Sequence, residues 1–378
     1  LSLSPCRTKP QPKPKPKPKP SSLLAARAMH RVEEKRSGGV AYTRGTWTGE
    51  SPRRPLVLYC HATGFCKEVW DCLALQECIG AAAAHDFIAL DFRGHGDSDG
   101  LHGADWPPKW ERCLVADIIN VLEAENALDG RPLLGVGHSM GASGLVLAAL
   151  SGVGFLGLVL FEPILVPYDA TDAQQDQKVL QRLVAGARRR RRRWRDGAEL
   201  KRYLAPKATF RTWNERAFEG YIRGGFRWNC GGGVPGVSRG IELKCDPRVE
   251  AFLYLGRCGR ATFAQLPKLM RGTRVAVVAG DASTHVRGPW GDAAGYMDQL
   301  RAAFNPNPNP NPHPNPNNPS VELWEGHTHW LPLEDPARAA RCVAAQLVAA
   351  ANPDPNANPN PNPNPNPNPN PNPGPKRW

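Results

Sequence analysis

The feature that most constrains the fold is a glycine-flanked serine behind a short apolar run. Gly137-His138-Ser139-Met140-Gly141 follows the run at 132–136 and leads into an Ala- and Leu-rich stretch at 141–150. The run predicts a buried strand and the stretch predicts a buried helix. Such a tight turn leaves no room for side chains two positions either side of the serine, so glycines are needed there. The hydroxyl of Ser139 is then held above the sheet on strained backbone.

Strand and helix signals alternate along the rest of the chain. Short apolar runs predict further strands at 55–60, 86–91, 157–161, 273–279 and 321–324. Apolar residues at helical spacing predict helices at 110–126 and 336–350. This alternation predicts an α/β fold, with a mostly parallel sheet and helices on both of its faces.

The chain divides into a core, an insertion and three low-complexity segments. We expect a disordered Lys/Pro-rich tail and lead-in at 1–40, a core at 41–162 and 271–351, and an inserted, largely helical cap at 163–270. Asn-Pro repeats predict a disordered loop at 305–319 and a disordered tail at 352–378. Proline at alternate positions removes backbone donors, and these segments have little apolar area to bury.

The net charge of +13 comes from two segments. Six basic residues lie in the first 19, and seven lie between Arg188 and Arg195; removing these 13 from 48 leaves 35 bases against 35 acids. We therefore expect a solvated tail and a solvated cap loop, and no specific nucleic-acid partner. The alternative is contact of the run from Arg188 to Arg193 with nucleic acid or an anionic membrane surface, because clustered arginines pair with phosphates.

No cofactor or metal is predicted. Ten cysteines are spread without a Cys-x-x-Cys pair, and neither His95 nor His102 has a cluster of carboxylates in sequence. We expect reduced cysteines that fill core spaces, which favours a reducing intracellular compartment, the cytoplasm or an organelle. No apolar run reaches the ~18 residues that a membrane-spanning helix needs.

Four motifs in this order resemble the α/β-hydrolase superfamily. The motifs are HATGF at 61–65, DFRGHGDSD at 91–99, GHSMG at 137–141 and GHTHWLPLEDP at 326–336. They are similar to that fold's oxyanion loop, strand-4 turn, nucleophile elbow and catalytic-histidine loop, and the resemblance covers about residues 41–351. It implies a serine hydrolase that acts through an acyl-enzyme on a small-molecule carboxylic ester, thioester or lactone. Oligomeric state is left open.

The resemblance also implies the site residues. Ser139 would be the nucleophile and His329 its base, with His327 as the nearest rival. The backbone amides of Met140 and Thr63 would bind the oxyanion, with Phe65 the second candidate for the latter.

The acid that orients the histidine is left between two residues. The commonest family position follows Gly280-Asp281, where this chain has Ser283. A second position lies at the end of the strand at 157–161 and holds Glu162. A carboxylate there needs a partner because the strand is fully apolar. We therefore favour Glu162 over Asp281, while the resemblance makes Asp97 structural.

Two other functions remain as hypotheses. Relatives of this fold include ligand receptors with little turnover, and the arginine run suggests an anion- or nucleic-acid-associated factor. Ser139 argues against epoxide hydrolysis and dehalogenation, because the resembling enzymes carry aspartate at the elbow.

Overall fold

The structure is a computed structural model that describes residues 30–49, 54–74, 84–101, 110–166, 174–229, 240–256, 258–270, 272–285, 292–304 and 319–351. The Lys-Pro tail, His102, the tail at 352–378 and nearly all of the Asn-Pro loop at 305–319 lie outside these residues.

The described elements are as follows in chain order. The strands are β1 (His30–Ser37), β2 (Val40–Trp47), β3 (Leu56–Cys60), β4 (Asp86–Leu90), β5 (Leu133–His138), β6 (Gly157–Phe161), β7 (Arg193–Trp194), β8 (Phe226–Asn229), β9 (Gly240–Leu243), β10 (Arg274–Gly280) and β11 (Ser320–Trp324). The helices are η1 (Lys67–Trp70), α2 (Asp71–Ala74), α4 (Trp110–Ala124), α5 (Met140–Leu150), α6 (Gln174–Arg188), α7 (Gly197–Leu204), α8 (Glu215–Gly224), α9 (Pro247–Leu253), α10 (Arg260–Phe263), α11 (Leu266–Leu269), α13 (Ala293–Phe304), α14 (Leu331–Glu334) and α15 (Pro336–Ala351).

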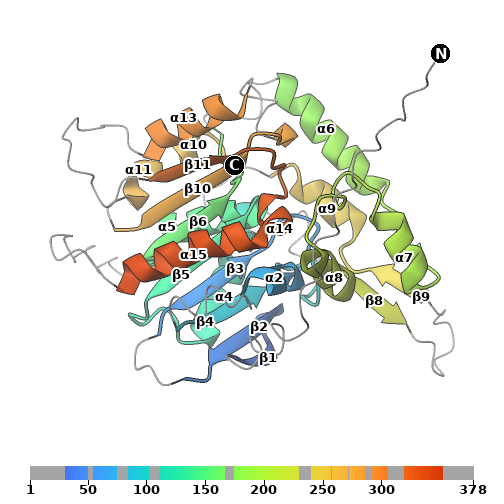
Figure 1. Cartoon of the computed structure of the whole chain (residues 1–378), viewed down its shortest axis with the longest axis horizontal. Helices are drawn as coiled ribbons and strands as arrows, with labels where there is room; N and C mark the ends of the chain where they lie inside the picture. Colours follow the sequence, from blue (N-terminus) through green and yellow to red (C-terminus); the bar gives the residue numbers. More distant parts are fainter. Residues whose placement is uncertain are drawn as a thin grey trace, which may run out of the picture.

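Eight strands form the central sheet, in the order β1-β2-β4-β3-β5-β6-β10-β11 (Figure 1). The strands from β4 to β11 pair in parallel, whereas β1 pairs with β2 and β2 with β4 in the antiparallel sense. The predicted α/β fold with a mostly parallel sheet is confirmed. Parallel strands place their carboxyl ends at one edge of the sheet, where loops from β5, β6, β10 and β11 can meet.

The sheet begins before the expected core start at 41, because β1 begins at His30 and β2 begins at Val40, and neither strand was predicted. Six consecutive residues of β1 are exposed, since the strand lies at the edge of the sheet. Its sequence therefore lacks the apolar alternation that marks a half-buried strand.

Side chains of the parallel strands alternate between two apolar cores. In β3, Leu58 and Cys60 belong to one core, whereas Val57 and Tyr59 belong to the other. Helices α4, α5 and α13 contribute side chains to the first core, and α15 contributes to the second. This alternation follows from the two-residue period of a strand, and it covers both faces of the sheet.

The segment inserted between β6 and β10 contains helices and a small sheet. Strands β7, β9 and β8 pair in the antiparallel sense, beside α6 to α9. The aromatic side chains of Trp213 and Tyr221 are buried, and both rings contact Phe65 of the core. Other residues of the predicted insertion join the first apolar core of the sheet, among them Val249 and Leu253 of α9 and Leu266 and Leu269 of α11.

Candidate active site

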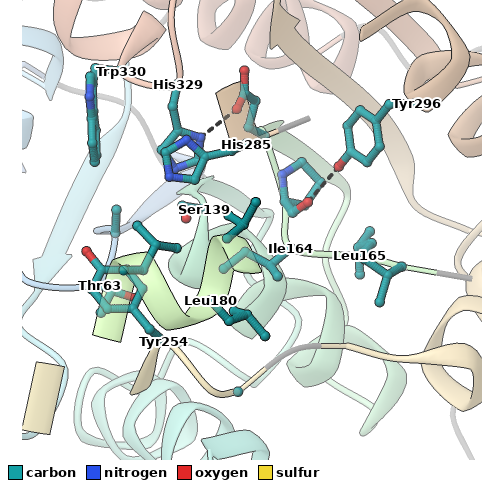
Figure 2. Close-up of a pocket in the computed structure, with 17 residues that line it drawn as sticks. Thr63, Ser139, Ile164, Leu165, Leu180, Tyr254, His285, Tyr296, His329 and Trp330 are labelled. Carbon is teal, nitrogen blue, oxygen red and sulfur yellow. Dashed lines mark hydrogen bonds and ion pairs between the residues drawn. The ribbon is translucent and has the colours of Figure 1, made fainter. Parts of the chain in front are cut away.

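Ser139 lies at the turn between β5 and α5 and lines a cavity (Figure 2). Its φ of 54° and ψ of −116° are strained for a residue with a side chain. A Cβ on Gly137 would lie 2.5 Å from the Ala142 Cα, and one on Gly141 would lie 2.2 Å from the Cys60 carbonyl oxygen. Both distances are too short for real Cβ atoms, so the turn requires glycine at both positions, as predicted.

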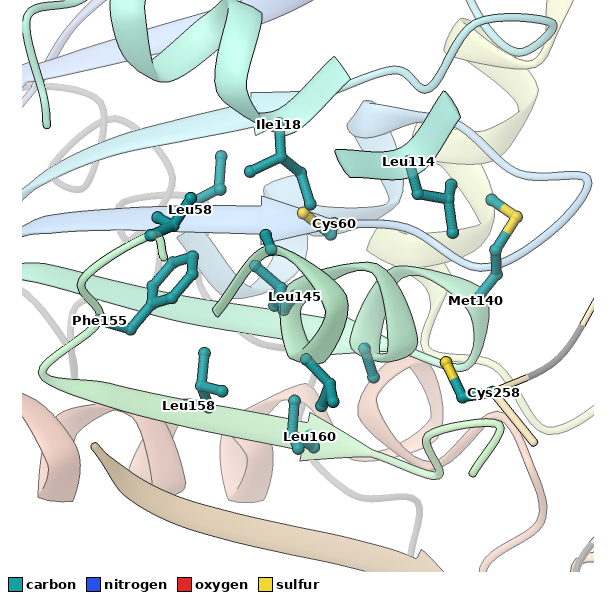
Figure 3. Close-up of a cluster of buried hydrophobic side chains, with 14 of the residues drawn as sticks. Leu58, Cys60, Leu114, Ile118, Met140, Leu145, Phe155, Leu158, Leu160 and Cys258 are labelled. Atoms are coloured by element: carbon teal, nitrogen blue, oxygen red, sulfur yellow. The ribbon is translucent and has the colours of Figure 1, made fainter. Parts of the chain in front are cut away.

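Helix α5 directly follows Ser139 and anchors this turn in the apolar core. Figure 3 shows Leu145 of α5 packed among Leu58, Leu158 and Ile118 in the first apolar core. Every residue of α5 from Met140 to Val146 is buried. A side chain on such a support is held more precisely than one on a free loop.

His329 and Glu162 meet beside the cavity that Ser139 lines. His329 Nδ1 lies 2.5 Å from Glu162 Oε2, and the two side chains are 6% and 1% exposed. Glu162 directly follows β6 at a φ of 42°. Its carboxylate also accepts hydrogen bonds from the Gly280 amide and the Ser283 hydroxyl, both at 2.8 Å. Burial raises the pKa of Glu162, and the bond from Gly280 opposes that rise.

The rival residues are engaged elsewhere. Asp281 Oδ1 accepts the Gly326 amide at 2.7 Å. His327 Nδ1 lies 2.8 Å from the carbonyl oxygen of Glu325. His138 packs beneath the site, with Nε2 2.8 Å from the carbonyl oxygen of His329. Of the two candidate carboxylates, Glu162 is therefore the one that contacts His329. Ser283, at the usual acid position, donates its hydroxyl to Glu162.

The HATGF turn is fixed by two buried histidines. The Gly64 amide donates to His95 Nε2 at 3.0 Å, and the Phe92 amide donates to His61 Nε2 at 3.1 Å. Burial lowers the pKa of both imidazoles, that of His61 to about 4, which suits neutral rings that accept hydrogen bonds. The Phe65 amide donates to the Ala62 carbonyl at 3.2 Å.

A buried lysine ties the same turn to the loop after β4. Lys67 Nζ lies 3.1 Å from Asp91 Oδ2 and 3.0 Å from Asp97 Oδ2. Asp91 also accepts the Asp97 amide at 2.9 Å. The Lys67 and Asp91 side chains are 1% and 0% exposed, so their charges depend on each other. Asp97 takes part in this network outside the cavity, in keeping with its expected structural role.

His285 is the residue at this site that sequence reasoning missed. Its ring stacks on that of His329, with centroids 3.9 Å apart and planes 22° apart, and it lines the cavity (Figure 2). Burial lowers the pKa of His285 to about 3, as it does that of His329. Its position two residues after Ser283 was the available signal, because the acid loop of the resembled family lies beside the histidine loop.

The cavity next to Ser139 is small and mostly apolar. Its volume is about 100 Å³. Thr63 and Trp330 lie on it with the reactive groups, and Ile164, Leu165 and Leu180 supply aliphatic wall (Figure 2).

Three further observations concern metal ligands, membrane-spanning helices and cysteines. Within the described ranges, no group of three or more His, Cys, Asp or Glu side chains is placed to hold a metal ion. No helix in the part of the chain that the structure covers is long and apolar enough to cross a bilayer. The seven cysteines with described surroundings are free thiols, five of them buried.

Comparison with known proteins gives both a family and a fold. Solved structures that resemble this chain include the peroxisomal alpha-beta-hydrolase Lpx1 from Saccharomyces cerevisiae, with a TM-score of 0.60 at 16% identity over 86% of this chain and 91% of Lpx1. A thioesterase domain from the curacin biosynthetic pathway matches with a TM-score of 0.55 at 18% identity, over 85% of this chain and 99% of that domain. A thermophilic esterase from Thermogutta terrifontis matches with a TM-score of 0.53 at 17% identity, over 85% and 99% respectively.

These identities establish the fold alone. A search of curated proteins finds no significant match. The sequence profile of the alpha/beta hydrolase family, however, matches residues 57–342, which is more than half of the 378 residues. The chain therefore belongs to the alpha/beta hydrolase family.

Proposed function

We propose that this protein is a serine hydrolase that cleaves a carboxylic ester or thioester through Ser139, His329 and Glu162. The observation that carries the proposal is the 2.5 Å contact between His329 Nδ1 and Glu162 Oε2 beside the cavity of Ser139. A carboxylate on Nδ1 fixes the imidazole tautomer whose Nε2 is free to accept a proton. Serine needs such a base before it can attack a carbonyl.

The reaction follows from these positions. His329 Nε2 takes the proton of the Ser139 hydroxyl as the oxygen attacks the substrate carbonyl, and Glu162 stabilises the imidazolium that forms. His329 then gives the proton to the leaving oxygen or sulfur, the bond to the carbonyl carbon breaks, and an acyl-enzyme remains. Water then gives a proton to His329 as its oxygen attacks the acyl carbon. The bond from that carbon to Ser139 Oγ breaks, His329 returns the proton to Oγ, and the acid leaves.

The Met140 and Thr63 amides are the proposed oxyanion donors. Met140 is the first residue of α5, so its amide has no partner within the helix. In the HATGF turn, the amides of Gly64 and Phe65 are used in hydrogen bonds, whereas Thr63 lines the cavity with Ser139. This favours Thr63 over Phe65. Each such donor is worth about 10²–10³ in rate.

The size of the cavity favours a short acyl chain. A volume of about 100 Å³ leaves room for a few carbons, and the nearby aliphatic side chains suit an apolar acyl group. Both an esterase and a thioesterase domain share the fold.

The test is hydrolysis of a panel of esters and thioesters with acyl chains of increasing length. Wild type should hydrolyse the short ones, and Ser139→Ala and His329→Ala should each lose several orders of magnitude, about 10⁶ by analogy with a serine triad. His327→Ala is the matched control and should stay near wild type. Turnover that survives in Ser139→Ala would refute the proposal. Ligand binding without turnover in wild type would support the receptor hypothesis instead.

A further inference from the structure

A second, larger cavity opens beside the one that Ser139 lines. Its volume is about 640 Å³. The two cavities share five wall residues, namely Leu183, Tyr254, His285, His329 and Trp330. His329 therefore lies at the junction of a small apolar cavity and a wider chamber bounded by α6, the arginine run and the residues after α7.

This chamber is strongly basic. Its lining cations are Arg182, Arg189, Arg190, Arg191, Lys207 and Arg211, and its only lining carboxylate among the described residues is Glu250. We call it the arginine chamber. Glu250 is already paired with Arg190, at 2.5 Å.

Much of this positive charge is not neutralised. Arg191 pairs with Glu199 at 2.6 Å, and Lys207 Nζ lies 4.1 Å from the centroid of the Tyr203 ring. No carboxylate of the described residues forms an ion pair with Arg182, Arg189 or Arg211. Cations that line a concave wall of partly apolar composition create a concentrated positive potential.

We propose that the arginine chamber binds an anionic group on the leaving part of the substrate, so that the substrate is an ester or thioester whose alcohol or thiol carries a carboxylate or phosphate. The inference rests on the proposed function. His329 must protonate the leaving oxygen or sulfur, so the leaving group departs on the side of His329. That side opens into the arginine chamber, whereas Ser139 and Thr63 lie on the apolar cavity that suits the acyl group.

The position of the charges favours a small ligand over a macromolecule. Arg189 and Arg191 line the chamber, whereas Arg188 and Arg193 of the same run do not. Arg193 instead approaches Glu242, at 3.4 Å. Arg189 and Arg191 instead converge with Arg182, Lys207 and Arg211 on one cavity that His329 also lines, whereas an extended polyanion would need cations spaced along a face.

The experiment compares two acetyl thioesters of similar size. One releases 3-mercaptopropionate, which carries a carboxylate, and the other releases neutral N-acetylcysteamine; the free thiol is measured for both. The measured quantity is the ratio of kcat/KM for the anionic over the neutral thioester. Any general damage to the enzyme cancels in this ratio.

Arg189→Gln should lower the ratio by about fivefold, as expected for the loss of a partly exposed ion pair. The triple variant Arg182→Gln/Arg189→Gln/Arg211→Gln should lower it further, and added salt should lower the ratio of the wild type. The matched control is Arg188→Gln, because Arg188 is exposed like Arg189 but does not line the chamber. The control should keep the ratio of the wild type.

An unchanged ratio in the triple variant, or an equal fall in Arg188→Gln, would overturn the proposal. If neither thioester is hydrolysed by wild type, a binding experiment tests the chamber separately, and the proposed function fails only if the esters of the panel are not hydrolysed either. Inorganic pyrophosphate is then titrated calorimetrically into wild type, Arg189→Gln and Arg188→Gln. Weaker binding in Arg189→Gln alone supports an anion subsite, and equal affinity in all three overturns it.

Discussion

Replacing Glu162 with glutamine keeps the shape of the side chain and removes its charge. Because Oε1 accepts the Gly280 amide, the amide oxygen of the glutamine should keep that place and its NH₂ should face His329. The glutamine NH₂ and the Nδ1–H of His329, both hydrogen-bond donors, would then face each other. The imidazole would therefore carry its proton on Nε2 instead. That tautomer cannot accept the proton of Ser139.

The expected loss of rate follows from the geometry. The contact between His329 and Glu162 is buried, and charge centres about 4 Å apart interact by about 4 kcal/mol at an effective dielectric constant of about 20. This corresponds to about 10³ in rate, and the wrong tautomer should bring the loss toward about 10⁴.

The assay is kcat for a hydrolysed thioester, together with the melting temperature to exclude unfolding. Asp281→Asn is the matched control, since Asp281 Oδ1 accepts the Gly326 amide, whereas His329 Nδ1 contacts Glu162. It should change kcat by less than about tenfold. A larger loss in Asp281→Asn than in Glu162→Gln would refute the reasoning and move the acid to Asp281.

Three further predictions concern pH and the support of the site. Burial lowers the pKa of His329 to about 3, so this base stays neutral at pH values below the ordinary histidine pKa of 6.5. The activity kcat/KM should therefore fall at acid pH with a midpoint below pH 6.5. A midpoint at or above pH 6.5 contradicts this prediction. Gly141→Ala should unfold or inactivate the protein, because the new Cβ would lie 2.2 Å from the Cys60 carbonyl oxygen. A denaturant titration should show a loss of about 3 kcal/mol or more in the free energy of unfolding. An unchanged midpoint would show that the turn relaxes. Lys67→Met should lower the free energy of unfolding by about 3–5 kcal/mol in the same titration, because it leaves the buried charge of Asp91 unpaired. Adding Asp91→Asn should restore part of that stability. An unchanged stability of Lys67→Met would mean that the ion pair is dispensable.

The parts of the fold that follow from local sequence rules were predictable. Apolar runs predicted the parallel strands because these strands are buried on both faces of the sheet. The two glycines at 137 and 141 predicted the turn at Ser139 because no side chain fits at either position. Strands β1 and β2 were both missed, and β1 is an exposed edge strand with no apolar face to detect. The contact of Glu162 with His329 was anticipated, since a carboxylate that ends an apolar strand needs a partner.

The remaining features depend on tertiary contacts that a single sequence does not display. His285 stacks on His329 only because the loops after β10 and β11 meet at the same edge of the sheet. The arginine run was interpreted as a solvated loop, and only the folded inserted segment places Arg189 and Arg191 in the same cavity wall as His329. The burial of His329, which lowers its pKa to about 3, is likewise a property of the folded chain.

The central claim is that Ser139 is the nucleophile, and covalent labelling tests it most directly. The protein is incubated with a fluorophosphonate, and the modified residue is identified by mass spectrometry of its peptides. The account predicts one adduct on Ser139 in wild type, slow labelling in His329→Ala and no adduct in Ser139→Ala. An adduct on another residue, or equal labelling of Ser139→Ala, would contradict it.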